Sequence, residues 1–510
     1  MQVTDRACHA PVKKNDPRLD DEVGGLAEVL QGRRAGVLLH PTSLPGDGEN
    51  GDFGKHAYWF VDWMVRARLG VWQVLPLGPT HDNGSPYQSM SAYAGNPALI
   101  SLELLVQDGL LSEQAVRDAG CSRAVCLEQA FACLKERRDG IYGEYLAFRN
   151  AHKNWLDDHC LFQALRSRYG ASSWLQWPEG LRARRPRALQ RARRELTAQI
   201  DLEAFRQFVF YRQWLALRRY ANERGVLLFG DLPIFVDLDS ADVWAYQQYF
   251  QLKDNGEPAV VAGVPPDYFS ATGQRWGNPL YDWERLAEDG YRWWIDRIRC
   301  QLTLFDFIRI DHFRGFESYW QIPAEEPTAL NGQWMKGPGD ALFEAIGAAL
   351  GRLPLVAEDL GLITEEVTAL RRRHHLPGMK VLQFAFDGSA QNPYLPHYHC
   401  RNSVVYTGTH DNDTTLGWYQ HLDEGTKVYI DDYLGGRVER PPWPFIRTAM
   451  ASVAELAIVP MQDFLELGSE HRMNQPGVSE GNWRWRFGWE QVPEDLADRI
   501  RHWCERYDRR

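Results

Sequence analysis

Eight short apolar runs recur along the chain, and their spacing limits the possible folds more than any other feature. Each is rich in Val, Ile, Leu or Phe and ends in polar residues: 35–45, 71–80, 225–236, 305–313, 353–361, 378–388, 403–412 and 456–464. Runs of this length are typical of strands buried on both faces, as in a parallel sheet. Helical patterns separate them, with an apolar stripe in 291–302 and a segment 201–224 that starts at Asp201, a plausible cap, and stops before Gly225. Strands that alternate with helices predict an α/β fold, a (β/α)8 TIM barrel.

Two intervals are too long to be simple crossovers between strands. Residues 97–200 predict an inserted helical region, and residues 237–290, rich in Gly, Pro and aromatics, predict an inserted active-site loop region. We expect both to form large inserted subdomains on the C-terminal rim, where active sites of such barrels lie. Residues 1–34 show no sustained hydrophobic period and predict a loosely ordered N-terminal lead-in. The catalytic barrel is therefore expected to span 35–510.

The composition restricts the partners and the cellular compartment. The chain of 510 residues is 44% hydrophobic and 25% charged, as in an ordinary globular protein. Its net charge of −11 opposes nucleic acid or an anionic membrane as a partner. No run has the length of a bilayer span, and the N-terminal residues lack the apolar core of a signal peptide. The 8 cysteines form no C-x-x-C pair, which predicts reduced thiols and a cytoplasmic location.

Three of the predicted strands end in an acidic residue. These are Asp311, Glu358 and Asp411. Because the carboxyl ends of barrel strands converge, acids that are distant in sequence should become neighbours. Glycoside chemistry needs two carboxyl groups, one nucleophilic and one a proton donor, and a third can stabilise a cationic transition state. One such acid alone is more often a helix cap or an ion-pair partner, but three at convergent strand ends favour catalysis.

The neighbours of these acids suggest their roles. Side chains alternate along a strand, so Arg309 and Asp311 should point the same way. A guanidinium group beside Asp311 would lower the pKa of that carboxyl and keep it ionised as a nucleophile. Glu358 is the better acid and base, because two nearby carboxylates should raise its pKa.

Three weaker patterns have ordinary explanations. The sequence GDGENG (46–51) matches a phosphate-cradling pattern, but its own acidic residues oppose pyrophosphate, so we expect a flexible rim loop. His397, His399 and Cys400 lack the partner motif of a metal site and predict a polar loop. The arginine-rich stretch 182–194 predicts an exposed helix face rather than a nucleic-acid site.

Seven longer motifs allow a comparison with known families. They are SPYQSMSAYAGNP (85–97), GDLPIFV (230–236), GVPPDYFSATGQRWGNPLY (263–281), RIDHFRGFESYW (309–320), AEDLG (357–361), TGTHDNDTTLGWY (407–419) and RMNQPG (472–477). In order and spacing they resemble the amylomaltase or disproportionating-enzyme family, the 4-α-glucanotransferases. The resemblance runs from about residue 35 to the C-terminus. It departs in the loop 44–54, which is more acidic than expected.

The resemblance implies a role for each matching residue. Asp311 would be the nucleophile that forms a β-glucosyl-enzyme, Glu358 the general acid and then base, and Asp411 the transition-state stabiliser, with Arg309 and His410 beside them. The residues expected to contact sugar are Ser85, Tyr87, Asp231, Gln274, Trp276 and Asn474. For Tyr87 and Trp276, simple packing at the rim is the alternative. No cofactor or metal is expected.

The expected reaction transfers α-1,4-glucan segments between maltooligosaccharide, starch or glycogen chains, with glucose also serving as an acceptor. A retaining mechanism predicts carboxyl groups about 5–5.5 Å apart in Asp311 and Glu358. An α-glucan hydrolase of the α-amylase-like clan shares this chemistry and is the alternative. A non-catalytic glucan-binding protein would be expected to lack one of the acids, and all three are present. The oligomeric state is left open.

Overall fold

The computed structural model describes residues 25–46, 48–120, 122–138, 140–266, 270–351, 353–478 and 480–510. Most of the predicted lead-in, 1–24, lies outside these residues, as does Asp47 of the predicted rim loop. The rest of the lead-in contains helix α1 (Gly25–Leu30) and the start of the first barrel strand.

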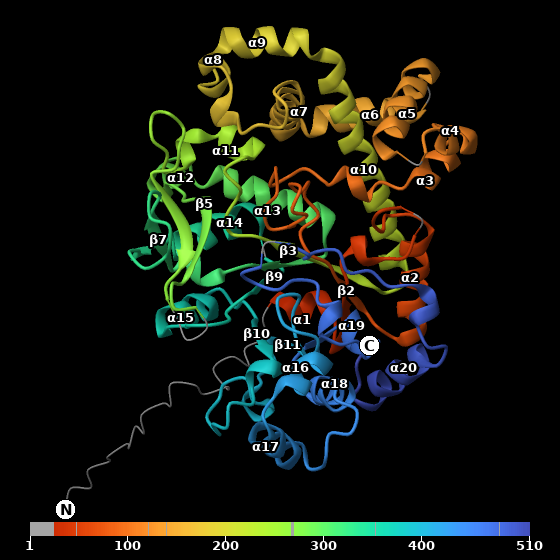
Figure 1. The fold of residues 1–510 in the computed structure, drawn as a ribbon, viewed down its shortest axis with the longest axis vertical. Coiled ribbons are helices and arrows are strands. Elements are labelled where there is room, and N and C mark those ends of the chain that lie inside the picture. Colours follow the sequence, from red (N-terminus) through yellow and green to blue (C-terminus); the bar gives the residue numbers. More distant parts are fainter. Residues whose placement is uncertain are drawn as a thin grey trace, which may run out of the picture.

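Eight parallel strands form a barrel at the centre of the molecule (Figure 1). They are β1 (Arg34–Leu38), β2 (Val71–Gln73), β3 (Leu227–Leu232), β6 (Phe307–Ile310), β9 (Leu355–Ala357), β10 (Gly378–Val381), β11 (Ser403–Tyr406) and β12 (Leu456–Pro460). Their order is β10-β11-β12-β1-β2-β3-β6-β9. The backbone N–H of Ala357 donates to the carbonyl of Pro377 at 2.9 Å, so the two outermost strands approach and the sheet nearly closes. Each predicted run overlaps one of these strands, although β1 begins one residue before its run, and the barrel prediction is confirmed.

The barrel strands are buried on both faces, which is why their sequences are mostly apolar. Every residue of β12 is buried, and so are four of the five residues of β1. The strands pack so closely on their surroundings that some positions exclude a side chain. At Gly230 in β3, an added Cβ would lie 2.3 Å from the ring of Phe305.

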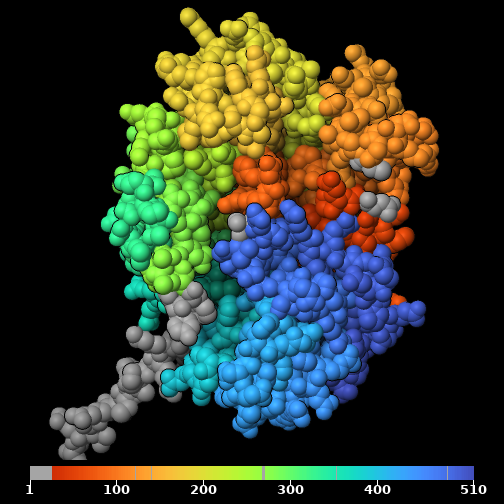
Figure 2. Space-filling model, in the orientation of Figure 1, coloured from red at the N-terminus to blue at the C-terminus, as the bar shows by residue number. Residues whose placement is uncertain are grey.

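The interval 97–200 folds into helices that lie beyond the barrel, in orange and yellow at the top of Figures 1 and 2. These helices are α3 (Leu102–Gln107), α4 (Glu113–Asp118), α5 (Arg123–Arg137), α6 (Gly140–Ala151), α7 (Lys153–Arg168), α8 (Glu179–Arg182) and α9 (Pro186–Glu195). The long helix α10 (Thr197–Glu223) returns the chain to the barrel. It begins before Asp201, so the prediction that Asp201 caps it is wrong. Instead, Asp201 accepts a hydrogen bond from Arg149 of α6 at 2.7 Å.

A second, antiparallel sheet forms a wall beside the barrel, in green at the left of Figure 1. Its strands lie in the order β5 (Gln274–Pro279), β4 (Val260–Val264), β7 (Ser318–Pro323) and β8 (Gln333–Lys336). The interval 237–290 supplies β4 and β5 together with α11 (Ala241–Ala245) and α12 (Trp283–Glu288). The sequence predicted neither β7 nor β8, which follow the barrel strand β6.

The remaining helices pack around the barrel. They are α2 (Lys55–Ala67), α13 (Arg292–Leu304), α14 (Asp340–Leu350), α15 (Glu365–Arg373), α16 (Thr415–His421), α17 (Glu424–Leu434), α18 (Pro442–Ala451), α19 (Met461–Phe464) and α20 (Leu496–Arg506). On α13 the predicted apolar stripe faces inward, with Trp294 and Ile298 buried. Within the described part of the chain, no helix has both the length and the apolar character that crossing a bilayer requires.

Candidate active site

Four acids lie at the carboxyl ends of barrel strands. Asp231 is part of the end of β3, Asp311 directly follows β6, Glu358 directly follows β9, and Asp411 lies in the loop after β11. Since β3, β6 and β9 are neighbours in the sheet, the first three acids stand side by side. The strand pairing continues into the site, because the N–H of Asp311 donates to the carbonyl of Leu232 at 3.0 Å.

Arg309 joins two of these carboxylates from inside the barrel. One terminal nitrogen donates to both oxygens of Asp231, at 2.8 and 2.7 Å, and the other donates to Asp311 at 2.9 Å. The side chains of Arg309 and Asp231 are 6% and 0% exposed, whereas Asp311 is 28% exposed. Arg309 therefore anchors Asp311 to a buried partner and leaves part of its carboxylate exposed to solvent.

Glu358 is held by two backbone groups. The N–H of His312 donates to one carboxylate oxygen at 2.6 Å, and the N–H of Leu360 donates to the other at 3.0 Å. His312 directly follows Asp311 and has a left-handed φ of 50°, which directs its N–H into this bond. Left-handed residues other than glycine are strained and cluster at functional sites. The loop that bears Asp311 thus also orients Glu358.

The pKa values of these two carboxyl groups differ in a useful way. Burial raises the pKa of Glu358, Arg309 opposes this and the charge of Asp311 adds to it, and together they raise the pKa to about 7. Burial also raises the pKa of Asp311, to about 6, and outweighs Arg309. The prediction that Arg309 would lower this pKa overall is therefore wrong, although its own effect has the expected sign. Glu358 has the higher pKa of the two and so keeps its proton to a higher pH than Asp311, as acid–nucleophile pairs require.

Asp411 is fixed by two side chains. Nδ2 of Asn474 donates to its Oδ1 at 2.7 Å, and Nε2 of His410 lies 3.3 Å from the same oxygen. The side chain of Asp411 is 48% exposed, and the protein that surrounds the rest of it would raise its pKa, but His410 and Asn474 hold the pKa below its ordinary value. For His410 the signs are opposite: burial would lower its pKa, but the adjacent Asp411 outweighs burial and raises the pKa above its ordinary value. Asp411 therefore stays ionised at neutral pH.

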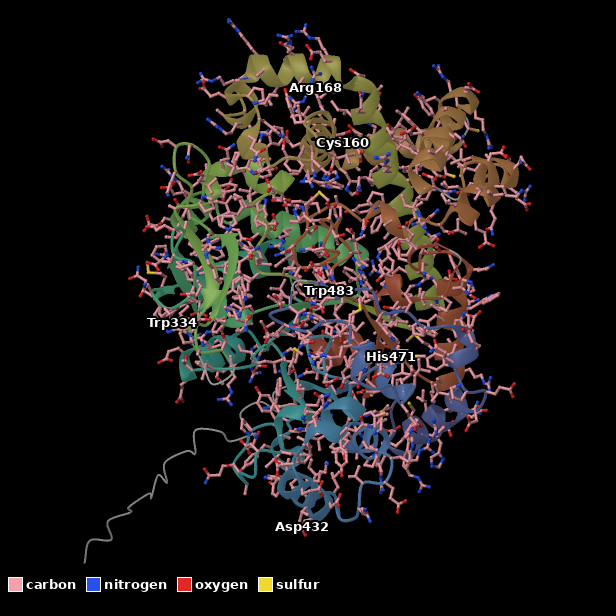
Figure 3. The ribbon with its side chains drawn as sticks, viewed as in Figure 1. Cys160, Arg168, Trp334, Asp432, His471 and Trp483 are labelled. Atoms are coloured by element: carbon pink, nitrogen blue, oxygen red, sulfur yellow. The ribbon has the colours of Figure 1, made fainter. Side chains whose placement is uncertain are left out.

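Tyr87 connects these two groups of residues. Its hydroxyl donates to Asp231 at 2.8 Å, and its ring stacks on His410 with centroids 5.1 Å apart and planes 14° apart. The ring of Trp483 tilts against both, 5.9 Å from Tyr87 and 6.0 Å from His410. Figure 3 shows Trp483 near the middle of the molecule. Sequence reasoning missed Trp483, although the aromatic GNWRWR (481–486) soon after RMNQPG was a usable signal.

The other predicted sugar contacts surround this centre. Nε1 of Trp276 donates to Oε1 of Gln274 at 3.2 Å, and its ring meets His312 edge to face with centroids 4.8 Å apart. Trp276 therefore lies beside the residue that orients Glu358. The backbone N–H of Ser85 donates to Asn83 at 3.0 Å, within the loop that bears Tyr87. Contact of these side chains with sugar stays a prediction.

The histidines considered for a metal site have other partners. Nδ1 of His397 lies 2.8 Å from the hydroxyl of Tyr433, and Nδ1 of His399 lies 2.7 Å from that of Ser452. These contacts fit the polar loop that the sequence predicted. Throughout the described residues, no three His, Cys, Asp or Glu side chains are grouped so that they could hold a metal ion.

A model of the 4-alpha-glucanotransferase family matches residues 39–490. The chain belongs to this family. It is 48% identical to the 4-alpha-glucanotransferase of Thermus thermophilus over 495 residues, covering 94% of this chain and 99% of the relative. It is 47% identical to the enzyme of Synechocystis sp. over 500 residues, with coverages of 94% and 99%.

Solved structures agree with this assignment. The amylomaltase from Streptococcus agalactiae, in complex with acarbose, is 36% identical with a TM-score of 0.90, covering 94% of this chain and 99% of that one. The amylomaltase from Corynebacterium glutamicum has a TM-score of 0.76 at 18% identity, covers 96% of this chain and 77% of that one, and supports the fold alone. The enzyme is thus a 4-α-glucanotransferase acting on α-1,4-glucans, which confirms the predicted family and activity. Neither the hydrolase nor the non-catalytic alternative is supported.

Proposed function

We propose that this enzyme transfers α-1,4-glucan segments by retaining double displacement, with Asp311 as the nucleophile and Glu358 as the acid and base. The main support is the pair itself: two carboxyl groups on adjacent strands whose pKa values are raised to about 6 and about 7. Asp311 attacks the anomeric carbon while Glu358 protonates the departing glucan. Glu358 then deprotonates the 4-hydroxyl of an acceptor glucan, which displaces Asp311 with net retention.

Asp411 would stabilise the positive charge that develops on the sugar ring. A fixed negative charge next to a developing cation lowers the barrier because it needs no rearrangement during the reaction. The contacts with His410 and Asn474 support this role, since they fix the carboxylate and favour its ionised form. Arg309 would keep Asp311 aligned for attack.

Sugar binding and the preference for transfer would come from the surrounding side chains. Tyr87 would hold the glucose unit at the nucleophile, and Asp231, whose side chain is 0% exposed, would support it from behind by fixing the Tyr87 hydroxyl. Trp276 with Gln274 would position the acceptor beside Glu358. A well-positioned acceptor can gain an effective concentration of ~10⁵ M or more, well above that of liquid water. Ser85 and Asn474 would add further hydrogen bonds to the glucan.

We propose maltooligosaccharides, starch and glycogen as donors, and glucans or glucose as acceptors. A reducing compartment such as the cytoplasm is supported by Cys133, Cys160, Cys300 and Cys504, which are free thiols among the described residues.

The Asp311→Asn variant tests the mechanism, because its amide cannot form the covalent ester. We expect it to fold normally and to lose at least ~10⁴-fold in rate. The assay follows maltotriose, from which a transferase releases glucose and longer chains. Asp432→Asn is the matched control, since Asp432 is an exposed acid of α17 at the lower edge of Figure 3. Near-normal turnover by Asp311→Asn would remove Asp311 from the mechanism.

A ligand-bound structure provides a second test. It should place the carboxyl groups of Asp311 and Glu358 about 5–5.5 Å apart, whereas a gap of about 9 Å would indicate inversion.

A further inference from the structure

Trp483 holds a backbone conformation that bulky residues rarely adopt. Its φ of 66° lies in the left-handed region, which requires strong support from the surrounding structure. Its N–H donates to the carbonyl of Met473 at 2.7 Å, and the side chain of the preceding Asn482 accepts from the N–H of Gln475 at 2.9 Å. These bonds close a loop around Asn474, the residue that donates to Asp411.

The Trp483 ring is wedged against two residues of the site. It contacts both members of the stacked pair Tyr87 and His410, at interplanar angles of 45° and 38°. Each of these rings holds a carboxylate, since Tyr87 donates to Asp231 and His410 faces Asp411. The ring therefore restricts the movement of both supports.

Asp411 depends on such indirect support because its side chain is 48% exposed. Its carboxylate contacts Asn474 at 2.7 Å and His410 at 3.3 Å. Trp483 constrains both partners, Asn474 through the closed loop and His410 through the ring. The charged groups that act on His410 include Asp411, Arg309, Asp231 and Asp311.

We propose that Trp483 is a positioning residue that fixes the Asp411 carboxylate for the transition state, acting through His410 and Asn474. This inference rests on the role proposed above for Asp411. Misplacing a charge that acts mainly in the transition state lowers kcat and changes KM little.

Three variants separate the ring from the backbone. Trp483→Gly removes the ring and relieves the left-handed strain, Trp483→Phe keeps a ring, and Asn482→Ala loosens the loop alone. We expect Trp483→Gly to lose about 10²-fold in kcat on maltotriose, a loss that a misplacement of about 1 Å can cause. Its KM should stay close to that of the parent, and Trp483→Phe should recover most of the rate. Trp59→Ala is the control, because Trp59 is 52% exposed on α2 and packs on His56.

Double variants distinguish positioning from a general loss of structure. If Trp483 acts through Asp411, combining Trp483→Gly with Asp411→Asn adds little to the loss from Asp411→Asn alone. Additive losses would overturn the inference. So would a higher KM with unchanged kcat in Trp483→Gly, which would indicate direct stacking on sugar.

The single variants also separate this inference from the proposed function. An active Asp411→Asn enzyme would refute the role of Asp411 itself. An inactive Asp411→Asn together with a fully active Trp483→Gly would refute the role of Trp483 alone.

Discussion

Replacing Arg309 with Met should shift the pH dependence of the reaction as well as lower its rate. Arg309 is the cation that contacts Asp311, at 2.9 Å, and it opposes the burial that raises the pKa of this carboxyl. At an effective dielectric constant of about 20, unit charges about 4 Å apart interact by about 4 kcal/mol, or about three pKa units. Because Asp311 must be ionised to attack, losing the cation should move the acidic limb of kcat/KM upward by about two to three pH units. At pH 7 the rate should fall about 10- to 100-fold and recover partly at higher pH.

The assay measures glucose release from maltotriose between pH 5 and pH 9.5, with urea unfolding to record stability. Breaking the buried pair with Asp231 should also cost about 3–5 kcal/mol of unfolding free energy. Arg297→Met is the matched control, since this buried arginine donates to the carbonyls of Pro233 and Ile234. It should lose stability without moving the acidic limb. An Arg309→Met enzyme whose acidic limb stays at the parent pH would refute this electrostatic account.

Two further changes test the site and the core. Because the folded state raises the pKa of Glu358, the parent binds this proton more tightly when folded and loses stability as pH rises toward about 7. The new glutamine side chain of Glu358→Gln cannot titrate, and transfer should be lost. In urea unfolding, the free energy of unfolding of the variant minus that of the parent should be larger at pH 8 than at pH 5. An equal difference at both pH values would contradict this. Gly230→Ala should lose about 1–3 kcal/mol, since its Cβ would clash with Phe305. Gly347→Ala in α14, where a Cβ meets nothing within 4 Å, should gain up to about 1 kcal/mol, and equal stability of the two alanine variants would refute the packing argument.

The barrel could be predicted because burial on both faces leaves a local record in the sequence. Strand β12, for example, has the sequence LAIVP, which is a continuous apolar run. The antiparallel wall leaves no such record. In β8 the residues QWMK are mostly exposed, and the strand exists because it pairs with β7. Such pairing depends on partners elsewhere in the chain, which periodicity does not reveal.

The site divides in the same way. The proximity of Asp311 and Glu358 could be predicted, because the barrel topology alone brings the strand ends together. The pKa of Asp311 was predicted with the wrong sign, since its burial arises from the whole fold. Asp201 looked like a cap for α10, but a tertiary contact with Arg149 explains it better. Trp483 reaches the site through packing between loops, which neither spacing nor hydrophobicity records.

The position of β1 has a consequence for how this enzyme is made. β1 pairs with β2 on one side and with β12 on the other. A ribosome must therefore synthesise the chain as far as Pro460 before the second edge of β1 finds its native partner. An open apolar strand edge is a template for aggregation. Production of this protein should thus depend on shielding that edge during translation, for example by a chaperone.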